Sequence, residues 1–130
     1  MSETKLVKEI LVALSAEPDF ICWRNNTGKL ADVNGRWVTY GLGVGSADII
    51  GVLRGKFVAL EPKGTHSDTC KCKSCSMQRL WGAAVLKAGG AYSKVRTLAE
   101  AKNVIHWVRM GRFPSGCAGC NYELRTGTVG

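Results

Sequence analysis

The chain has 130 residues, 45% of them hydrophobic, and its 18 lysines and arginines outnumber 10 aspartates and glutamates, which gives a formal net charge of +8. This composition fits one domain with an ordinary core and excludes a disordered chain. No apolar run reaches the roughly 18 residues that cross a bilayer, and the N-terminus shows no signal-peptide pattern, so we expect a cytoplasmic protein without a membrane partner. The positive charge favours a polyanionic partner such as nucleic acid, although a merely soluble basic protein has the same balance.

The first predicted element is a helix over residues 3–15, in which Leu6, Ile10 and Leu14 recur at helical spacing and Ser2 is the candidate N-cap. The other predicted elements are strands at 20–24, 36–40, 48–53, 56–63 and 91–95, and helices at 77–87 and 98–110.

The segments between these elements are expected to be loops, above all residues 25–28 and 64–75, and the tail after residue 112 is expected to be irregular. The order of the elements predicts the α/β class, with a mixed central sheet flanked by helices. We expect a single domain over residues 1–130.

The strands at 48–53 and 56–63 form a predicted hairpin that brings chemical groups together. Its two-residue turn, Arg54-Gly55, puts residue 53 opposite residue 56, so that Asp48 lies opposite Glu61. Residues two apart on a strand share a face, which places Lys63 on the same side as Glu61. We therefore expect two carboxylates and an ammonium at one edge of the sheet.

Two neighbouring carboxylates repel each other unless a cation lies between them, and Mg²⁺ commonly binds through one or two carboxylates, water and phosphate. Such an ion can polarise a phosphodiester and activate a water, and Lys63 could orient that water or stabilise the charge that develops on phosphorus. The alternative is a surface hairpin with an ordinary Glu–Lys pair, because an isolated E-x-K is common.

A third acid, Glu3, falls on the centre line of the apolar stripe of the first helix. An acid on the core side requires a partner, which a metal or a lysine would provide. The alternative is a frayed terminal residue in water, at a helix end that favours negative charge. Glu9 lies further from the stripe centre and is the weaker candidate.

Several motifs in order resemble the virus-type replication-repair nuclease family within the PD-(D/E)xK superfamily. They are Ser2-Glu3, Trp23-Arg24-Asn25-Asn26-Thr27-Gly28, Gly45-Ser46-Ala47-Asp48-Ile49-Ile50-Gly51, Phe57-Val58-Ala59-Leu60-Glu61-Pro62-Lys63, and Gln78-Arg79-Leu80-Trp81 leading to Ala88-Gly89-Gly90. The resemblance covers about residues 2 to 96.

This resemblance implies a PD-(D/E)xK restriction-endonuclease-like core and a DNA endonuclease that depends on Mg²⁺ or Mn²⁺. It implies that Asp48 and Glu61 are metal ligands, Lys63 is the catalytic lysine, Glu3 is the helix acid near the metal, and Gln78 is the family glutamine. The resemblance to small members of this family further implies a phage or bacterial protein, which in the phage case acts in the host cytoplasm. It also implies a homodimer that cuts branched DNA such as Holliday junctions. The long link between Lys63 and Gln78 departs from the family pattern and leaves the preferred DNA open.

That link and the tail hold cysteine pairs that predict a structural zinc site, because a C-x-x-C turn supplies two of the four thiolates of a closed tetrahedral site. The expected ligands are Cys72, Cys75, Cys117 and Cys120, with Cys70 as an alternate. His66 is a further candidate. The insert at about 64–76 and the tail at about 112–125 would form this zinc knuckle, and the alternatives are buried thiols or a redox pair.

Basic residues near these segments are candidate DNA phosphate contacts, although any one of them can be ordinary solvated charge. The candidates are Arg24, Lys71, Lys73 and Arg79, with Lys94, Arg96, Arg109 and Arg112 as further members of a phosphate-binding rim. Two interpretations stay open beside a junction-cutting nuclease. One is a non-catalytic, zinc-containing DNA-binding module, and the other is a restriction or nicking enzyme on the same fold.

Overall fold

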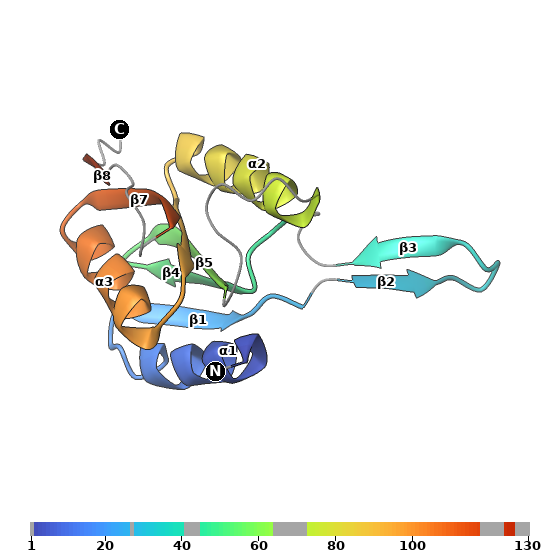
Figure 1. The fold of residues 1–130 in the computed structure, drawn as a ribbon, viewed down its shortest axis with the longest axis horizontal. Coiled ribbons are helices and arrows are strands. Elements are labelled where there is room, and N and C mark those ends of the chain that lie inside the picture. The colour runs from blue at the N-terminus through green and yellow to red at the C-terminus, as the bar shows by residue number, and fades with distance from the viewer. Residues whose placement is uncertain (1, 27, 41–44, 64–72, 118–123, 127–130) are drawn as a thin grey trace.

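The structure, a computed structural model, describes residues 2–26, 28–40, 45–63, 73–117 and 124–126 and has a mixed α/β fold (Figure 1). The helices are α1 (Glu3–Leu14), α2 (Lys73–Lys87) and α3 (Leu98–Arg109). The strands are β1 (Phe20–Arg24), β2 (Gly28–Ala31), β3 (Trp37–Tyr40), β4 (Ile49–Leu53), β5 (Lys56–Pro62), β6 (Ala91–Val95), β7 (Arg112–Cys117) and β8 (Leu124–Thr126).

The main sheet is mixed and runs in the order β1-β4-β5-β6-β7-β8. Strands β1, β4 and β5 are antiparallel neighbours, whereas β6 runs parallel to both β5 and β7. Helices α1 and α3 cover one face of this sheet and α2 covers the other, which gives three layers (Figure 1). The mixed sheet flanked by helices confirms the predicted class.

Strand alternation separates two apolar cores. The larger core joins α1 and α3 to residues such as Ile49, Val58 and Leu60. The smaller core joins α2, through Trp81, to Ala59 and Tyr92 on the opposite face. The face that holds the smaller core is the one toward which the side chain of Glu61 points, because Glu61 and Ala59 are two residues apart.

Several predicted elements agree with the structure. Helix α1 begins at Glu3, and the Ser2 hydroxyl accepts a hydrogen bond from the Lys5 N–H at 3.2 Å, so the predicted N-cap is confirmed. The turn at Arg54-Gly55 has positive φ at both residues, 50° and 83°, as a two-residue hairpin turn requires.

Three predictions at the loops were wrong. Helix α2 begins at Lys73 rather than residue 77, so it includes the end of the segment that had been expected to be a loop. The expected irregular tail contains β7 and β8, paired antiparallel with each other. Residues 28–31 form a strand, β2, which pairs with β3, although Gly28 had been assigned to a loop and no strand had been predicted here. In each case tertiary packing or pairing extends an element beyond its local signal.

The β2–β3 hairpin forms a separate two-stranded sheet that projects from the body of the molecule (Figure 1). We call residues 28–40 the arm. Its tip is built on Asp32, whose carboxylate accepts hydrogen bonds from the N–H groups of Asn34 and Arg36 at 2.9 and 2.8 Å. Gly35, with φ of +77°, closes this turn.

A cluster of ion pairs lies at the end of β1 and β4 that is remote from Asp48. Asp19 accepts hydrogen bonds from Arg54 at 2.7 Å and from Arg109 at 2.6 and 2.8 Å, and Arg109 also donates to Glu17 at 2.9 Å. The cluster ties the start of β1, the end of β4 and the end of α3 together.

No helix in the described part of the chain is long and apolar enough to cross a membrane.

Candidate active site

The register of β4 and β5 brings Asp48 and Glu61 together. Ile49 pairs with Leu60, so the next residues outward, Asp48 and Glu61, are opposite each other. The ladder between the strands ends there, and the Asp48 N–H donates instead to Glu61 Oε2 at 2.9 Å. The predicted juxtaposition of the two acids is therefore confirmed, and the two strands separate at this point.

Glu61 is almost fully buried, with 3% of its surface exposed, and two groups donate hydrogen bonds to its carboxylate. Its Oε2 accepts from the Asp48 backbone, and its Oε1 accepts from Gln78 Nε2 at 2.9 Å. Gln78 lies on α2, so this bond connects the helix layer to the sheet. A carboxylate has about four lone-pair sites, so both oxygens of Glu61 can still accept another ligand.

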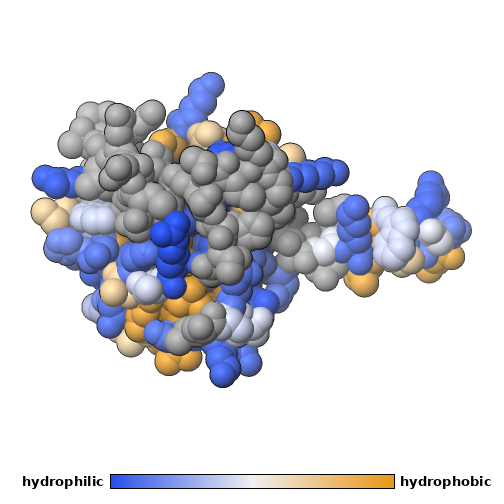
Figure 2. Space-filling view, viewed as in Figure 1, coloured by the Kyte–Doolittle hydropathy of each residue, from blue (hydrophilic) through white to orange (hydrophobic). Residues whose placement is uncertain are grey.

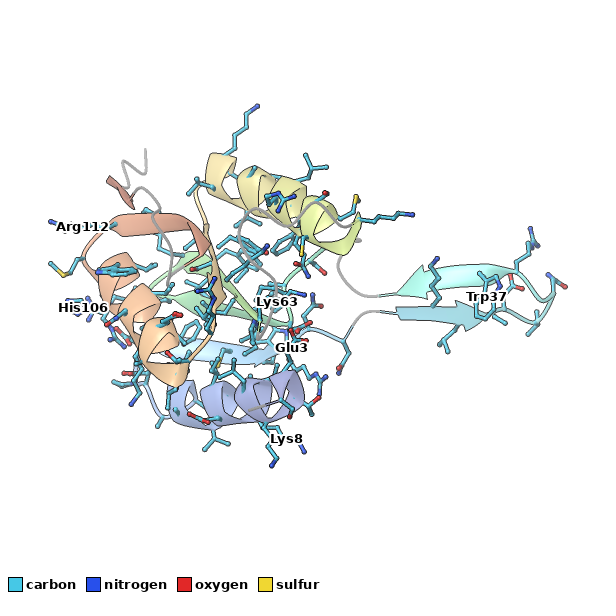
Figure 3. The ribbon with its side chains drawn as sticks, in the orientation of Figure 1. Glu3, Lys8, Trp37, Lys63, His106 and Arg112 are labelled. Atoms are coloured by element: carbon cyan, nitrogen blue, oxygen red, sulfur yellow. The ribbon has the colours of Figure 1, made fainter. Side chains whose placement is uncertain are left out.

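Lys63 and Glu3 complete the charged surroundings of this carboxylate pair. The Lys63 Nζ lies 3.7 Å from Glu61 Oε1, and the Lys63 side chain is 12% exposed. Glu3 lies in the first turn of α1, at an exposed position, and its negative charge raises the pKa of both Asp48 and Glu61. Figure 3 shows Glu3 and Lys63 in the same region of the molecule, far from Trp37 on the arm.

The acids of the site are hard to ionise in this environment. Burial is the main reason why the pKa of Glu61 is raised to about 7, and the charge of Asp48 raises it further. Burial also raises the pKa of Asp48, while Lys63 and Arg24 partly offset that effect. A cation between the two carboxylates would remove the cost of ionising them.

A side-chain amide and a close backbone approach keep the loop before Asp48 in place. Asn25 follows β1 and donates from Nδ2 to Ser46 Oγ and to the Ala47 carbonyl, both at 2.9 Å. Gly45, with φ of +85°, passes so close to α2 that a Cβ there would meet the Met77 carbonyl oxygen at 2.5 Å. Only glycine allows this approach, which brings the Asp48 loop against the helix turn that carries Gln78.

The residues fit a divalent cation with two protein carboxylates. Among the residues that the structure describes, no group of three or more His, Cys, Asp or Glu side chains is close enough to hold a metal. Asp48 and Glu61 are the adjacent carboxylates that could supply protein oxygens, and the remaining ligands would be water, backbone or substrate, as is common for Mg²⁺. Glu3 lies near both acids on α1, and its role as a metal ligand stays a prediction.

The predicted zinc site lies mostly outside the described residues, which leave out Cys70, Cys72, Cys120 and His66. Cys75 is described and is fully buried in the first turn of α2. Cys117 ends β7, in register with Lys94 of β6, and its side chain is not described. The zinc hypothesis stays a prediction.

The basic residues differ in their surroundings. Arg24 and Lys73 are exposed and Arg79 is partly buried, so they can still contact a ligand, whereas Lys71 lies outside the described residues. Arg109 is engaged by Asp19 and Glu17 at the remote end, so its assignment to a phosphate-binding rim was wrong. Lys94, with 2% exposure, was also wrongly assigned to that rim.

Sequence reasoning missed two residues of this region. Asn25 was predicted to be a loop residue, and its Asn-Asn-Thr-Gly context gave no signal that its amide would tie β1 to the Asp48 loop. Lys94 is buried in register with Glu61, and its Nζ has no hydrogen-bond partner among the described residues. No local pattern signalled its burial, because β6 is buried at every position and this depends on the distant elements that cover both of its faces.

A comparison with models of known protein families gave no match for this chain. A comparison with curated proteins also found no match. The functional conclusion therefore rests on the geometry of the site and on the sequence motifs.

Proposed function

We propose that the chain is a metal-dependent DNA endonuclease with a PD-(D/E)xK core that hydrolyses phosphodiester bonds. The observation that carries the proposal is the adjacent pair of the partly buried Asp48 and the buried Glu61, with the Lys63 ammonium 3.7 Å from the second carboxylate. A structural ion pair would match one acid to one base. This site instead holds two acids whose pKa values are both raised.

Asp48 and Glu61 would hold Mg²⁺ or Mn²⁺, which when bound supplies a Lewis acid for a phosphodiester and lowers the pKa of a water. Gln78 and the Asp48 N–H fix the Glu61 carboxylate, so its oxygens are oriented before any substrate arrives. Such orientation matters because a misplaced group loses much of its effect in the transition state.

Lys63 is the group best placed to act on the substrate itself. It extends from the end of β5 on the same face as Glu61, and its backbone N–H donates to the Val95 carbonyl at 2.9 Å, which fixes the strand end. Its ammonium would stabilise the negative charge that develops on the phosphoryl oxygens or hold the attacking water. The negative charge of Glu3 near both acids would add to the attraction for a cation.

The proposal also includes features that depend on the sequence motifs. The substrate would be branched DNA such as a Holliday junction, cut by a homodimer with two active sites. The cysteine-rich segments would bind a structural zinc, and Lys71, Lys73, Arg24 and Arg79 would contact DNA phosphates. The protein would be of phage or bacterial type. The net charge of +8 supports a polyanionic substrate.

The test is a cleavage panel of linear duplex, fork, flap and four-way junction DNA with Mg²⁺ or Mn²⁺. We expect the wild-type protein to cut at least one branched substrate, and Lys63→Met to lower the rate about 100-fold or more while DNA binding persists. Lys102→Met on the exposed side of α3 is a matched control, and it should cut normally.

Two other outcomes would revise the proposal. Binding without cleavage, for all substrates and both metals, would favour a non-catalytic DNA-binding module. Equal cleavage of linear and branched DNA would favour a restriction or nicking enzyme and remove the junction specificity.

A further inference from the structure

Exposed apolar side chains are grouped in two places that no part of the described chain covers. One is the arm, which projects into solvent (Figure 2). Its exposed hydrophobic residues are Leu30 at 64%, Val33 at 101%, Trp37 at 74% and Val38 at 49% exposure. The second place is the part of the sheet that α2 leaves uncovered, with Ile21 at 71%, Trp23 at 48% and Val52 at 41% exposure.

We call Ile21, Trp23 and Val52 the open face. Register shows that they form one patch, because Ile21 pairs with Val52 on the neighbouring strand and Trp23 is two residues along β1. Their neighbours toward the sheet centre belong to the smaller core: Val52 pairs with Phe57, and Trp23 pairs with Ile50. The open face is thus the uncovered continuation of a core layer, and it is apolar for that reason.

The arm presents apolar groups on both of its faces. Leu30 pairs with Val38, and Ala31 pairs with Trp37, so the two pairs point to opposite sides of the ribbon. A two-stranded hairpin alone is only marginally stable in water. An exposed ribbon with a largely solvent-exposed tryptophan therefore needs a covering surface, and apolar patches of this kind mark protein contacts more than nucleic-acid contacts.

We infer that two copies of the chain exchange their arms, with Trp37 of each arm packed on the open face of the other copy. A two-fold pair is self-complementary, so each chain needs one projecting apolar element and one uncovered apolar face, and this chain has both. Trp37 and Trp23 of each chain supply a substantial part of the roughly 1,200 Å² that a specific interface buries. This arrangement specifies the homodimer of the proposed function, but it does not depend on cleavage.

The arm does not favour DNA as its occupant. Its cations are Lys29 and Arg36, and Asp32 lies 3.7 Å from Arg36 and neutralises part of that charge. A ribbon that reads a DNA groove relies on charged and polar groups for its affinity. The apolar side chains of this arm outnumber its cations.

The test uses light scattering on Trp37→Glu and Ile21→Lys, alone and mixed, without DNA. Both positions are exposed, so the fold should survive, and thermal unfolding checks this. We expect a dimer mass for the wild-type protein and a monomer mass for each variant at the same concentration. The mixture should recover a dimer mass, because one native arm then meets one native open face, and the charges introduced at the other contact are opposite in sign.

Val12→Lys is the matched control, since Val12 is 77% exposed on α1 and belongs to neither surface. It should leave the dimer intact. A wild-type monomer would overturn the inference, and so would a dimer that Ile21→Lys leaves unchanged, because the arms would then contact each other or something else. Loss of DNA binding in Trp37→Glu with no change of mass would assign the arm to DNA instead. Cleavage by a wild-type monomer would retain the proposed nuclease while removing this dimer.

Discussion

The two ends of the β1–β4 strand pair each carry a charged cluster, and their acids behave in opposite ways. At one end Asp19 receives hydrogen bonds from Arg109 and Arg54, and the bond from Arg109 is the main reason why its pKa is held below the ordinary value. At the other end burial raises the pKa of Asp48 and of Glu61. The first cluster matches its acids with bases, whereas a cation would lower the cost of ionising the acids of the second. This difference separates a structural charge cluster from a candidate active site.

The largest expected effect concerns cleavage. Asp48→Asn keeps the size of the side chain but removes one of the two carboxylate charges, so the rate of DNA cleavage should fall about 1,000-fold or more. Gel assays of rate and binding in parallel would check this, with DNA affinity expected to persist. If Asp48→Asn cut DNA at the wild-type rate, the raised pKa values of Asp48 and Glu61 would not mark a catalytic site.

The second effect concerns the pH dependence of stability in buffer without added divalent cations. Because the folded pKa of Glu61, about 7, exceeds the ordinary 4.5, the folded state binds more protons between these values. The free energy of unfolding should therefore fall by up to about 3 kcal/mol as pH rises from 4.5 to 7. The raised pKa of Asp48 acts with the same sign.

Urea unfolding at a series of pH values measures this slope, and Glu61→Gln should flatten it. Asp19 should act in a different window, because its depressed pKa stabilises the fold above the ordinary value of 3.8 and loses that effect only at lower pH. An equal slope in Glu61→Gln and the wild-type protein would mean that Glu61 is not the group responsible.

The third effect concerns the ion-pair cluster around Asp19. Arg109→Met removes the donor shared by Asp19 and Glu17, so the Tm should fall by several degrees. DNA cleavage at a temperature well below the Tm should not change. A cleavage defect in the folded variant would show that the remote cluster also serves the active site.

The smallest effect concerns Lys94, which belongs to neither cluster. Its ammonium has no hydrogen-bond partner among the described residues, although it is buried. Lys94→Met should therefore raise the free energy of unfolding by about 1 kcal/mol, whereas the exposed Lys102→Met should change it little. A marked loss of stability in Lys94→Met would reveal a favourable partner for the ammonium.

The sequence predicted the active-site geometry better than the surface architecture, for a physical reason. A two-residue turn fixes strand register, so the positions of Asp48, Glu61 and Lys63 followed from Arg54-Gly55 and strand alternation. The β2 strand carried little signal because it has no buried face, and β7 was obscured by Pro114, which rarely lies in a strand. The burial of Lys94 and the pairing of Arg109 depend on contacts with distant elements, which local patterns do not encode.

The central claim is that Asp48 and Glu61 together bind a divalent cation, and a calorimetric titration with Mn²⁺ tests it most directly. The wild-type protein should bind one Mn²⁺ per chain and release protons near pH 7, because Glu61 must ionise on binding. Asp48→Asn and Glu61→Gln should each weaken this binding at least tenfold, and Arg109→Met should leave it unchanged. Equal Mn²⁺ affinity in all four proteins, or no uptake by the wild-type protein, would contradict the claim.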